Sequence, residues 1–565
     1  MSKQKLELTW IGKENQPVLE PRILIEDPDK SYGDNSADNM LIFGDNLLAL
    51  KALEQDFAGK IKCIYIDPPY NTGAAFAYYD DGVEQSLWLS LMRDRLLYLH
   101  NLLNKEGIIF CSIDASELFY LGALFDEIFG RTNRIEVIAW KKSYGGGAKS
   151  KYFVNQHEFI LCYAKELSCA PLLFLPADKS ATKYYKYKDD KFETRGPYRL
   201  QPLATTSMDD RPNLRYPIII ENGIEIWPDK QWQWSKERVS EALKNDEIVI
   251  SQKQEKYIVS YKQYLKNEDG DERLSKPKSV IEGAYTQHGT YESIRLFGLK
   301  NKFSFPKPES LIWQLIECCT ISGDWILDSF IGSGTTAAVA HKMGRRWIGI
   351  ELGEHCHTHC LPRLKQVVDG TDQGGISKAV NWKGGAGFKY YYLAPSLLKQ
   401  DTHGNWIIDD CYNPDMLAAA MAKHEGFRYD PDTESYWKQG RSTEKDFIFT
   451  TTQFVTLELL DKLHEEMKQD ESLLICCKSF SKSCEGRFSN IDVKKIPNML
   501  LGRCEFGRED YSLNIINMPV DQESLKPNDM TDGTDHLFPS EATLPEKRTR
   551  RKKKSDNNQL TLFDT

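Results

Sequence analysis

Two consecutive prolines directly after an apolar run constrain this chain more than any other feature. Residues 61–66, Ile-Lys-Cys-Ile-Tyr-Ile, are typical of a buried parallel strand. Asp67, Pro68, Pro69 and Tyr70 follow at once, and the prolines end the strand because they restrict the backbone and lack N–H groups. Open α/β sheets place their ligands at such carboxyl ends. A carboxylate, a carbonyl and an aromatic ring presented together suit an amino group on a flat, flipped-out base.

A second motif argues against the alternative, an ordinary Pro-Pro turn without chemistry. Residues 325–336, Trp-Ile-Leu-Asp-Ser-Phe-Ile-Gly-Ser-Gly-Thr-Thr, predict a strand, a turn and a helix start. Gly332 and Gly334 allow close backbone approach and positive φ, and the two threonines are candidates to cap the helix. The next predicted strand, residues 347–350, ends in Glu351, 19 positions after Gly332. This is near the spacing at which an acidic residue meets ribose hydroxyls in nucleotide-binding βαβ units.

The third glycine of the dinucleotide fingerprint is replaced here by Ala337, which counts against NAD. With the Asp-Pro-Pro-Tyr motif preceding the Phe-x-Gly-x-Gly motif, the chain resembles the β group of DNA adenine-N6 methyltransferases. Residues 41–46, 156–163 and 305–311 resemble further segments of that family. Residues 67–73, the long middle block and the long C-terminal part resemble the modification subunits of type III restriction–modification systems, although solitary enzymes share this layout.

The resemblance implies an α/β fold: a doubly wound, mostly parallel, Rossmann-like class I methyltransferase sheet with circularly permuted motif order. It also implies an inserted target-recognition domain and an additional C-terminal α/β domain. The last of these is expected to contain strands at 388–393 and 473–477 and a helix near 456–468. The expected division is a lead-in at 1–40, a catalytic half at 41–165, a target-recognition insert at 166–300, a cofactor half at 301–385, the C-terminal domain at 386–525, and a disordered basic tail at 526–565.

The same resemblance implies S-adenosyl-L-methionine as cofactor and assigns roles to residues. The adenine amino group would donate to Asp67 and to the carbonyl of Pro68, held by Pro69, and Tyr70 would stack on the extruded base. These hydrogen bonds would localise the lone pair of the attacking nitrogen. The residues expected around the cofactor are Asp45, Lys307, Asp328, Phe330, Gly332, Gly334, Thr335 and Glu351.

Charge distribution bears on DNA binding more than the net charge of −9 does. Between residues 141 and 200, 12 basic residues face 6 acidic ones. Lys183, Tyr185 and Lys186 belong to an alternating aromatic and basic segment that suits phosphates and bases; an edge strand guarded by lysines explains it equally well. Arg211 and Arg215 are further DNA-binding candidates. Trp232 and Trp234 share one strand face and are expected in the core.

Other patterns limit the remaining classes of function. Histidines and cysteines at 355–360 invite a zinc interpretation, but adjacent residues of one helix face different directions, so no metal is expected. Thirteen cysteines without disulfide-like spacing and the absence of an 18-residue apolar run favour a bacterial cytoplasmic, nucleoid-associated protein. No Gly-x-x-x-x-Gly-Lys-Ser/Thr motif is present, so ATP hydrolysis of the P-loop kind is not expected.

Expected partners are double-stranded DNA, a second copy of the chain and a separate restriction (helicase-nuclease) subunit. Gln559, Leu562 and Phe563 end the polar tail and resemble a motif that binds the bacterial sliding clamp. Cytosine-N4 methylation, RNA methylation and a non-catalytic DNA-specificity subunit stay open as alternatives. Nucleoside analysis of modified DNA separates the first from adenine methylation, and labelled methyl transfer separates the last.

Overall fold

The computed structural model describes residues 7–70, 81–145, 152–176, 183–206, 209–220, 223–254, 256–271 and 273–511, with backbone only for 81–84. Gln559, Leu562 and Phe563 of the predicted clamp motif, the basic run at 547–554 and residues 71–73 lie outside these ranges. Within them, no helix combines the length and apolar character needed to cross a bilayer.

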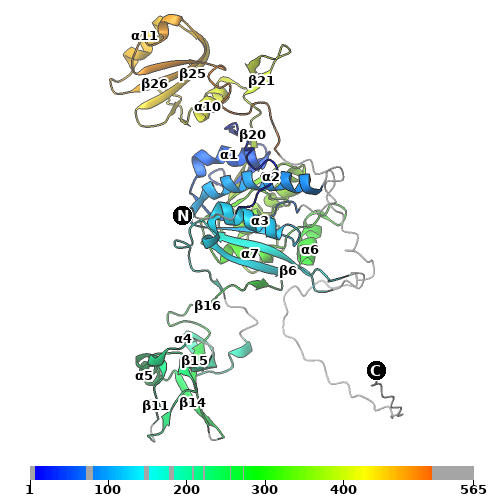
Figure 1. Ribbon diagram of the computed structural model, residues 1–565, viewed down its shortest axis with the longest axis vertical. Helices are drawn as coiled ribbons and strands as arrows, with labels where there is room; N and C mark the ends of the chain where they lie inside the picture. The colour runs from blue at the N-terminus through cyan, green and yellow to red at the C-terminus, as the bar shows by residue number, and fades with distance from the viewer. Residues whose placement is uncertain are drawn as a thin grey trace, which may run out of the picture. The chain divides into compact units, whose positions relative to one another are not determined.

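One large sheet organises the described part of the chain (Figure 1). Pairing is parallel from β20 through β3, β19, β18 and β4 to β5, and antiparallel where β7 joins β5 and β6. The predicted mostly parallel, doubly wound sheet is therefore confirmed. The 11 strands run in the order β1 (Leu24–Glu26), β20 (Gly387–Leu393), β3 (Met40–Phe43), β19 (Arg346–Glu351), β18 (Trp325–Asp328), β4 (Ile61–Ile66), β5 (Leu103–Ile113), β7 (His157–Ala164), β6 (Arg134–Lys141) and β17 (Val280–Ile281), with β2 (Tyr32–Gly33) beside β20.

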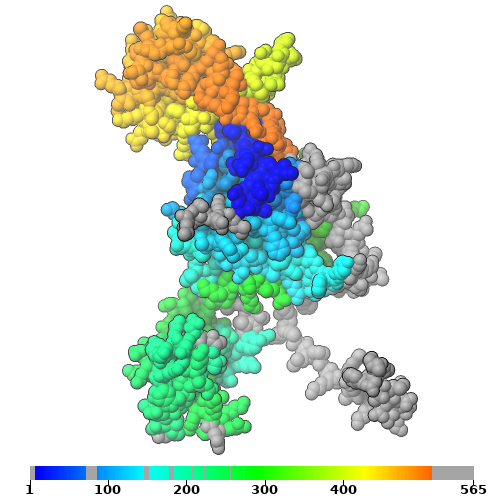
Figure 2. Space-filling view, in the orientation of Figure 1, coloured from blue at the N-terminus to red at the C-terminus, as the bar shows by residue number. Residues whose placement is uncertain are grey.

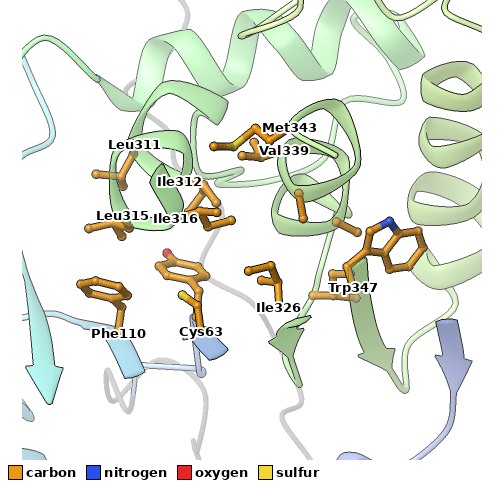
Figure 3. Close-up of a cluster of buried hydrophobic side chains, with 14 of the residues drawn as sticks. Cys63, Phe110, Leu311, Ile312, Leu315, Ile316, Ile326, Val339, Met343 and Trp347 are labelled. Carbon is orange, nitrogen blue, oxygen red and sulfur yellow. The ribbon is translucent and has the colours of Figure 1, made fainter. Parts of the chain in front are cut away.

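Apolar residues alternate between two cores because both faces of this sheet are covered. Within β4, Cys63 and Tyr65 belong to one buried cluster, whereas Ile64 and Ile66 belong to the other. Helices α7 (Glu309–Glu317) and α8 (Thr335–Lys342) cover the first face, where their side chains pack over four central strands (Figure 3). Helices α1 (Asn46–Phe57), α2 (Asp81–Leu102) and α3 (Leu118–Phe125) contribute to the second cluster.

The strand order reverses between β18 and β4. The β18–α8–β19 unit winds to one side of the sheet, and the β4–α2–β5 unit winds to the other. Ile326 of β18 pairs with Cys63 of β4, and Leu327 pairs with Ile64. Ligands of open α/β sheets bind outside the carboxyl ends of strands at such a reversal.

The N-terminal segment, up to about residue 15, packs on helix α2. The indole of Trp10 donates to Ser90 Oγ of α2 at 2.8 Å, and Arg93 of α2 donates to backbone carbonyls of the segment. In Figure 2 the dark-blue N-terminal residues cover the lighter blue surface behind them.

A second sheet of five strands follows, with the three longest parallel. The strand predicted at 473–477 lies in β26 (Ser472–Phe480), and the helix predicted near 456–468 is α11 (Leu457–Glu466). The strand predicted at 388–393 exists as β20, but its assignment to the C-terminal domain is wrong because it pairs in parallel with β3 of the large sheet. The elements are β21 (Leu398–Gln400), β22 (Trp406–Ile408), α10 (Pro414–His424), β23 (Arg428–Tyr429), β24 (Gly440–Arg441), β25 (Asp446–Val455), α11 (Leu457–Glu466), β26 (Ser472–Phe480) and β27 (Ile491–Lys495), after α9 (Leu361–Val368).

Residues 166–300 lack a βαβ rhythm, as their composition predicted. Trp232 is 2% exposed in the small core there and donates to the carbonyl of Tyr216 at 2.7 Å, so its expected core position is confirmed; Trp234 packs against the same core, partly buried. The elements are β8 (Leu175–Pro176), α4 (Phe192–Arg195), β9 (Tyr198–Pro202), β10 (Ala204–Thr205), β11 (Ile218–Ile219), β12 (Glu225–Ile226), β13 (Gln231–Trp232), α5 (Lys236–Lys244), β14 (Ile248–Lys253), β15 (Lys256–Tyr264), β16 (Leu274–Ser275) and α6 (Thr286–Phe297).

Candidate active site

The two predicted motifs meet at the strand reversal. Asp67 follows the last residue of β4, and Asp328 is the last residue of β18, the strand beside it. The glycine turn at 332–334 follows β18, and Glu351 ends β19, the next strand. Residues far apart in the sequence therefore share the carboxyl edge of three adjacent parallel strands, the place where such sheets bind ligands.

Lys307 is the main partner of Asp67. Its Nζ lies 2.8 Å from each carboxylate oxygen of Asp67 and 3.0 Å from Tyr70 Oη. The single hydrogen of the Tyr70 hydroxyl has two acceptors within reach, Asp67 Oδ1 at 2.9 Å and Glu158 Oε2 at 3.2 Å. Glu158, on β7, lies 3.6 Å from Lys307 Nζ and accepts from Lys142 at 3.0 Å. Two carboxylates, two ammonium groups and a phenol thus form one connected cluster.

Electrostatics settle the protonation state of three members of this cluster. Burial lowers the pKa of Lys307, but the charges of Asp67 and Glu158 outweigh burial and raise the pKa above its usual value. For Glu158, burial raises the pKa, but Lys307 and Lys142 outweigh it and lower the pKa. Burial and the charge of Asp67 push the pKa of Tyr70 well above its usual value. At neutral pH, Lys307 and Glu158 are therefore charged and Tyr70 is neutral.

The proline pair is held by helix α2. Trp88, 1% exposed, donates its indole N–H to the carbonyl of Pro69 at 2.8 Å. Pro68 is buried beside it, and Tyr70 is half-buried with Lys307 Nζ 5.2 Å from its ring centroid. The turn is thus anchored through Pro69, while Asp67 keeps a side chain that is 24% exposed.

The glycine turn needs its glycines for conformation. Gly332 has φ of 55° and Gly334 has φ of 82°, both in the left-handed region that favours glycine. Gly334 itself is the N-cap of α8, which has no side-chain cap, so the expected capping by the two threonines is wrong. Thr336 Oγ1 instead donates to Asp328 Oδ2 at 2.6 Å.

Glu351 holds the turn against the end of β19. Its Oε2 accepts from the backbone N–H of Gly332 at 2.9 Å, and its Oε1 accepts from Leu352 and Gly353 at 3.0 Å each. His355 lies 3.0 Å from the same carboxylate. Burial lowers the pKa of His355, but Glu351 outweighs burial and raises the pKa. Glu351 therefore fixes the geometry of the loop.

Asp328 and Ser329 carry polar groups with little solvent. Asp328 Oδ1 accepts from the N–H of Phe330 at 2.9 Å, yet burial outweighs this bond and the one from Thr336 and raises the pKa of Asp328 to about 7. The hydroxyl of Ser329 is buried and has no hydrogen-bond partner among the described residues. Buried polar atoms are nearly always paired, so this hydroxyl is an exception among the described residues of the site. Phe330 packs half-buried on the second core.

Three residues expected around the cofactor are engaged in other contacts. Lys307 binds the acid of the first motif, as described above. Thr335, the first residue of α8, is 5% exposed, and its Oγ1 accepts from Arg363 at 2.8 Å. Asp45 caps α1 by accepting from the N–H of Leu48 at 3.0 Å, and it also accepts from Tyr511 N at 3.1 Å. Asp45 still lines a cavity of about 350 Å³ together with Gly44 and Leu352.

The predicted DNA-binding residues lie in the insert, and no contact among described residues joins them to Asp67. Lys183 and Lys186 are exposed, whereas Tyr185 is half-buried 5.2 Å from the guanidinium of Arg199. Arg215 is exposed and forms an ion pair with Asp210. Arg211 is exposed, and its backbone N–H donates to Gln231 at 2.8 Å.

The histidine and cysteine segment does not converge. His355 contacts Glu351, His357 contacts the hydroxyl of Tyr390, and His359 contacts the carbonyl of Asn301. In the described ranges, no group of three or more His, Cys, Asp or Glu residues has the geometry to hold a metal ion.

Sequence reasoning gave no role to Glu158, Lys142, Trp88 or Ser329. One signal was present for Glu158, because it is a charged residue in a predicted core strand, directly before the apolar run at 159–163. Lys142 and Trp88 had no local signal, since each acts through a partner distant in the sequence, and the burial of the Ser329 hydroxyl is likewise set by the tertiary structure.

Comparison with protein families decides the membership of the chain. Residues 61–360, more than half of the chain, match the model of a DNA methylase family, N6_N4_Mtase. The chain belongs to this DNA methylase family. The matched segment of the methylase contains both motifs, the insert and the segment of Lys307.

Individual relatives agree with this family membership. The methylase is 33% identical over 414 residues to the probable type III restriction-modification enzyme HindVI Mod subunit of Haemophilus influenzae, covering 65% of the chain and 55% of the relative. It is 31% identical over 409 residues to the type III enzyme EcoPI Mod subunit of Escherichia phage P1, covering 60% and 62%. It is 32% identical over 339 residues to type II methyltransferase M.KpnI of Klebsiella pneumoniae, covering 54% and 77%. The chain thus spans about half to three-fifths of the first two relatives.

Proposed function

We propose that this methylase transfers a methyl group to the N6 atom of adenine in duplex DNA at a specific sequence, with the target base extruded from the helix. One observation carries the proposal: Asp67 and the glycine turn at 332–334 lie on adjacent strand ends at the reversal of strand order. A hydrogen-bond acceptor for an amino group thus lies beside a loop suited to a nucleotide-like ligand.

The residues at the turn fit S-adenosyl-L-methionine. The polar groups at this edge are the Ser329 hydroxyl, which has no partner among the described residues, and the carboxyl groups of Asp328 and Glu351, beside a turn in which Gly332 and Gly334 carry no side chain. Hydroxyl, amino and carboxylate groups of the cofactor are suitable partners for such a set. When bound, the cofactor supplies an activated methyl group.

The chain contributes positioning and electrostatics. The amino group of the base would donate one hydrogen to the Asp67 carboxylate and the other to the carbonyl of Pro68, and both bonds localise the lone pair on nitrogen. As the amino nitrogen formed its bond to the methyl carbon, the bond from that carbon to the sulfonium sulfur would break and leave a neutral thioether, and Asp67 would accept the proton that the nitrogen releases. Tyr70 presents an aromatic face for the extruded base, and extrusion costs a few kcal/mol that stacking offsets in part.

The test is methyl transfer from labelled cofactor to DNA by the wild type and by Asp67→Ala, with nucleoside analysis of the product. We expect N6-methyladenine with the wild type, no transfer with the variant, and cofactor affinity that is largely retained, because uniform binding does not depend on Asp67. Normal methylation by the variant contradicts the assignment. N4-methylcytosine as product supports the cytosine alternative instead.

We further propose that the chain is the modification subunit of a type III restriction–modification system. The names and the likeness of two relatives support this role. Co-purification with a helicase-nuclease subunit expressed from the same operon tests it, and light scattering tests the proposed homodimer. The sliding-clamp proposal rests on Leu562 and Phe563 and predicts that changing both to alanine abolishes clamp capture.

A further inference from the structure

The Asp67 carboxylate is occupied in the free protein. Lys307 Nζ contacts both of its oxygens at 2.8 Å, and Tyr70 Oη donates to one of them at 2.9 Å. A carboxylate has about four lone-pair positions, and three are used. The Lys307 ammonium thus holds a position on each oxygen, and an amino group that approaches either oxygen meets this ammonium beside it.

A second carboxylate that can pair with this ammonium lies next to Asp67. Glu158 Oε2 lies 3.6 Å from Lys307 Nζ and is already linked to Asp67 through the hydroxyl of Tyr70. The rings of Tyr70 and Trp140 lie 5.2 and 5.7 Å from Nζ and stabilise a cation between the two carboxylates. The ammonium thus has a short path from one carboxylate to the other that stays over aromatic faces.

This inference rests on the proposed function. We propose that Lys307 holds the place of the target amino group on Asp67 until the base arrives, and that Glu158 then takes the ammonium over. Both are positioning residues, because they act through Asp67. The exchange needs no proton transfer: Lys307 stays an ammonium, both carboxylates stay ionised, and the local charge does not change.

The exchange explains why two carboxylates converge on one lysine. Without Lys307, Asp67 and Glu158 would share only the hydroxyl of Tyr70, and two like charges in one site raise the pKa of one of them. Lys307 therefore lowers the pKa of Glu158 and keeps that carboxylate ionised at neutral pH, and Glu158 in turn offers the ammonium a second ion pair. The titratable and charged groups that face the cluster are Tyr65 and Asp67 at β4, Tyr70, Cys111 on β5, Lys142 after β6, Glu158 on β7 and Asp328 on β18.

The experiment measures kcat, the KM for DNA and cofactor affinity against pH for Lys307→Met, Glu158→Gln, the double variant and Lys307→Arg. Lys300→Met serves as the matched control, because Lys300 is exposed in the segment that leads to Lys307. Lys307→Met should shift the acid limb of the kcat/KM pH profile, where activity falls as pH falls, to higher pH by about one unit or more. At a pH below the shifted limb, this corresponds to about a tenfold loss of kcat/KM. Lys307→Arg restores the charge and should return the acid limb.

Glu158→Gln should act differently. It removes the second carboxylate that could pair with Lys307, so the ammonium stays on Asp67. We therefore expect the KM for DNA to rise by about tenfold or more, while kcat at saturating DNA falls less. The double variant removes one charge of each sign and should return the acid limb toward the wild-type position. A merely structural role would lower activity without moving the pH limb or separating KM from kcat.

Two results overturn the inference: Lys307→Met changing only cofactor affinity with an unmoved pH profile, or Glu158→Gln leaving the KM for DNA unchanged. Failure of the proposed function is distinguishable, because the wild type would then transfer no methyl group to any DNA. If the wild type is active but the variants keep its pH profile and its KM for DNA, the inference is rejected and the proposed function still stands.

Discussion

Asp328 should make the stability of this methylase depend on pH, and Asp328→Asn should remove that dependence. Burial raises the pKa of Asp328 from 3.8 to about 7. At about 1.36 kcal/mol for each pH unit, the difference corresponds to about 4 kcal/mol. Local relaxation around the buried charge keeps the actual contribution at or below this value.

The sign follows from proton binding. Between about pH 4 and 7 the folded protein keeps a proton on Asp328 that the unfolded chain has lost. The contribution of Asp328 to the free energy of unfolding is therefore largest at about pH 4, falls as pH rises, and is constant above about pH 7. Asparagine imitates the neutral acid and still offers an oxygen to the N–H of Phe330.

Calorimetric melting of the two proteins between about pH 5 and 8 tests the argument. At pH 5 the wild type has already lost about 1.6 kcal/mol, so the variant should melt slightly higher there. The difference should widen to about 4 kcal/mol above about pH 7, where the variant should melt several degrees higher than the wild type. Comparing the two proteins cancels other buried groups, such as Glu292, whose pKa burial raises to about 8. Parallel pH slopes would refute the reasoning.

Four further outcomes follow. Glu309→Gln should lower the free energy of unfolding by about 3–5 kcal/mol, because it unbalances two buried cations at 2.8 Å; a denaturant midpoint that hardly moves contradicts this. Gly334→Ala should cost about 1–2 kcal/mol, since φ is 82° there, and should weaken cofactor binding, as calorimetric titration can show. Trp232→Ala should cost about 3–5 kcal/mol and expose residues 166–300 to limited proteolysis; a wild-type cleavage pattern argues against its core role. Arg211→Ala should leave melting unchanged within about 0.5 kcal/mol yet weaken DNA binding in gel shifts, and unaltered affinity would remove it from the interface.

Local patterns predicted much of the central sheet. The run at 61–66 is apolar at every position but one. Such a continuous apolar run is typical of a strand that is buried on both faces. The turn at 332–334 needs glycines for positive φ, whatever surrounds it. Strand β20 shows the limit of such patterns: an aromatic, alternating segment predicts a strand, but its neighbour is chosen by long-range pairing with β3.

The partners of side chains were less accessible than the elements. Lys307 was expected beside the cofactor, and it bonds Asp67 across 240 positions of sequence. Thr335 was expected at the same site, and it points into the buried charges around Arg363. Neither outcome has a local signal, because the direction of a side chain at a helix start depends on what packs against that helix.

The sequence by itself determined the strand-ending acid and the glycine turn, because backbone conformation and burial pattern are local properties of residue types. The doubly wound class followed from the resemblance of these motifs to a known family. Only the tertiary structure decided that Lys307, Tyr70 and Glu158 surround Asp67. Ion pairs and hydrogen bonds act over about 3–4 Å, so the charge state of this edge depends on which strands become neighbours, and residue order does not state that.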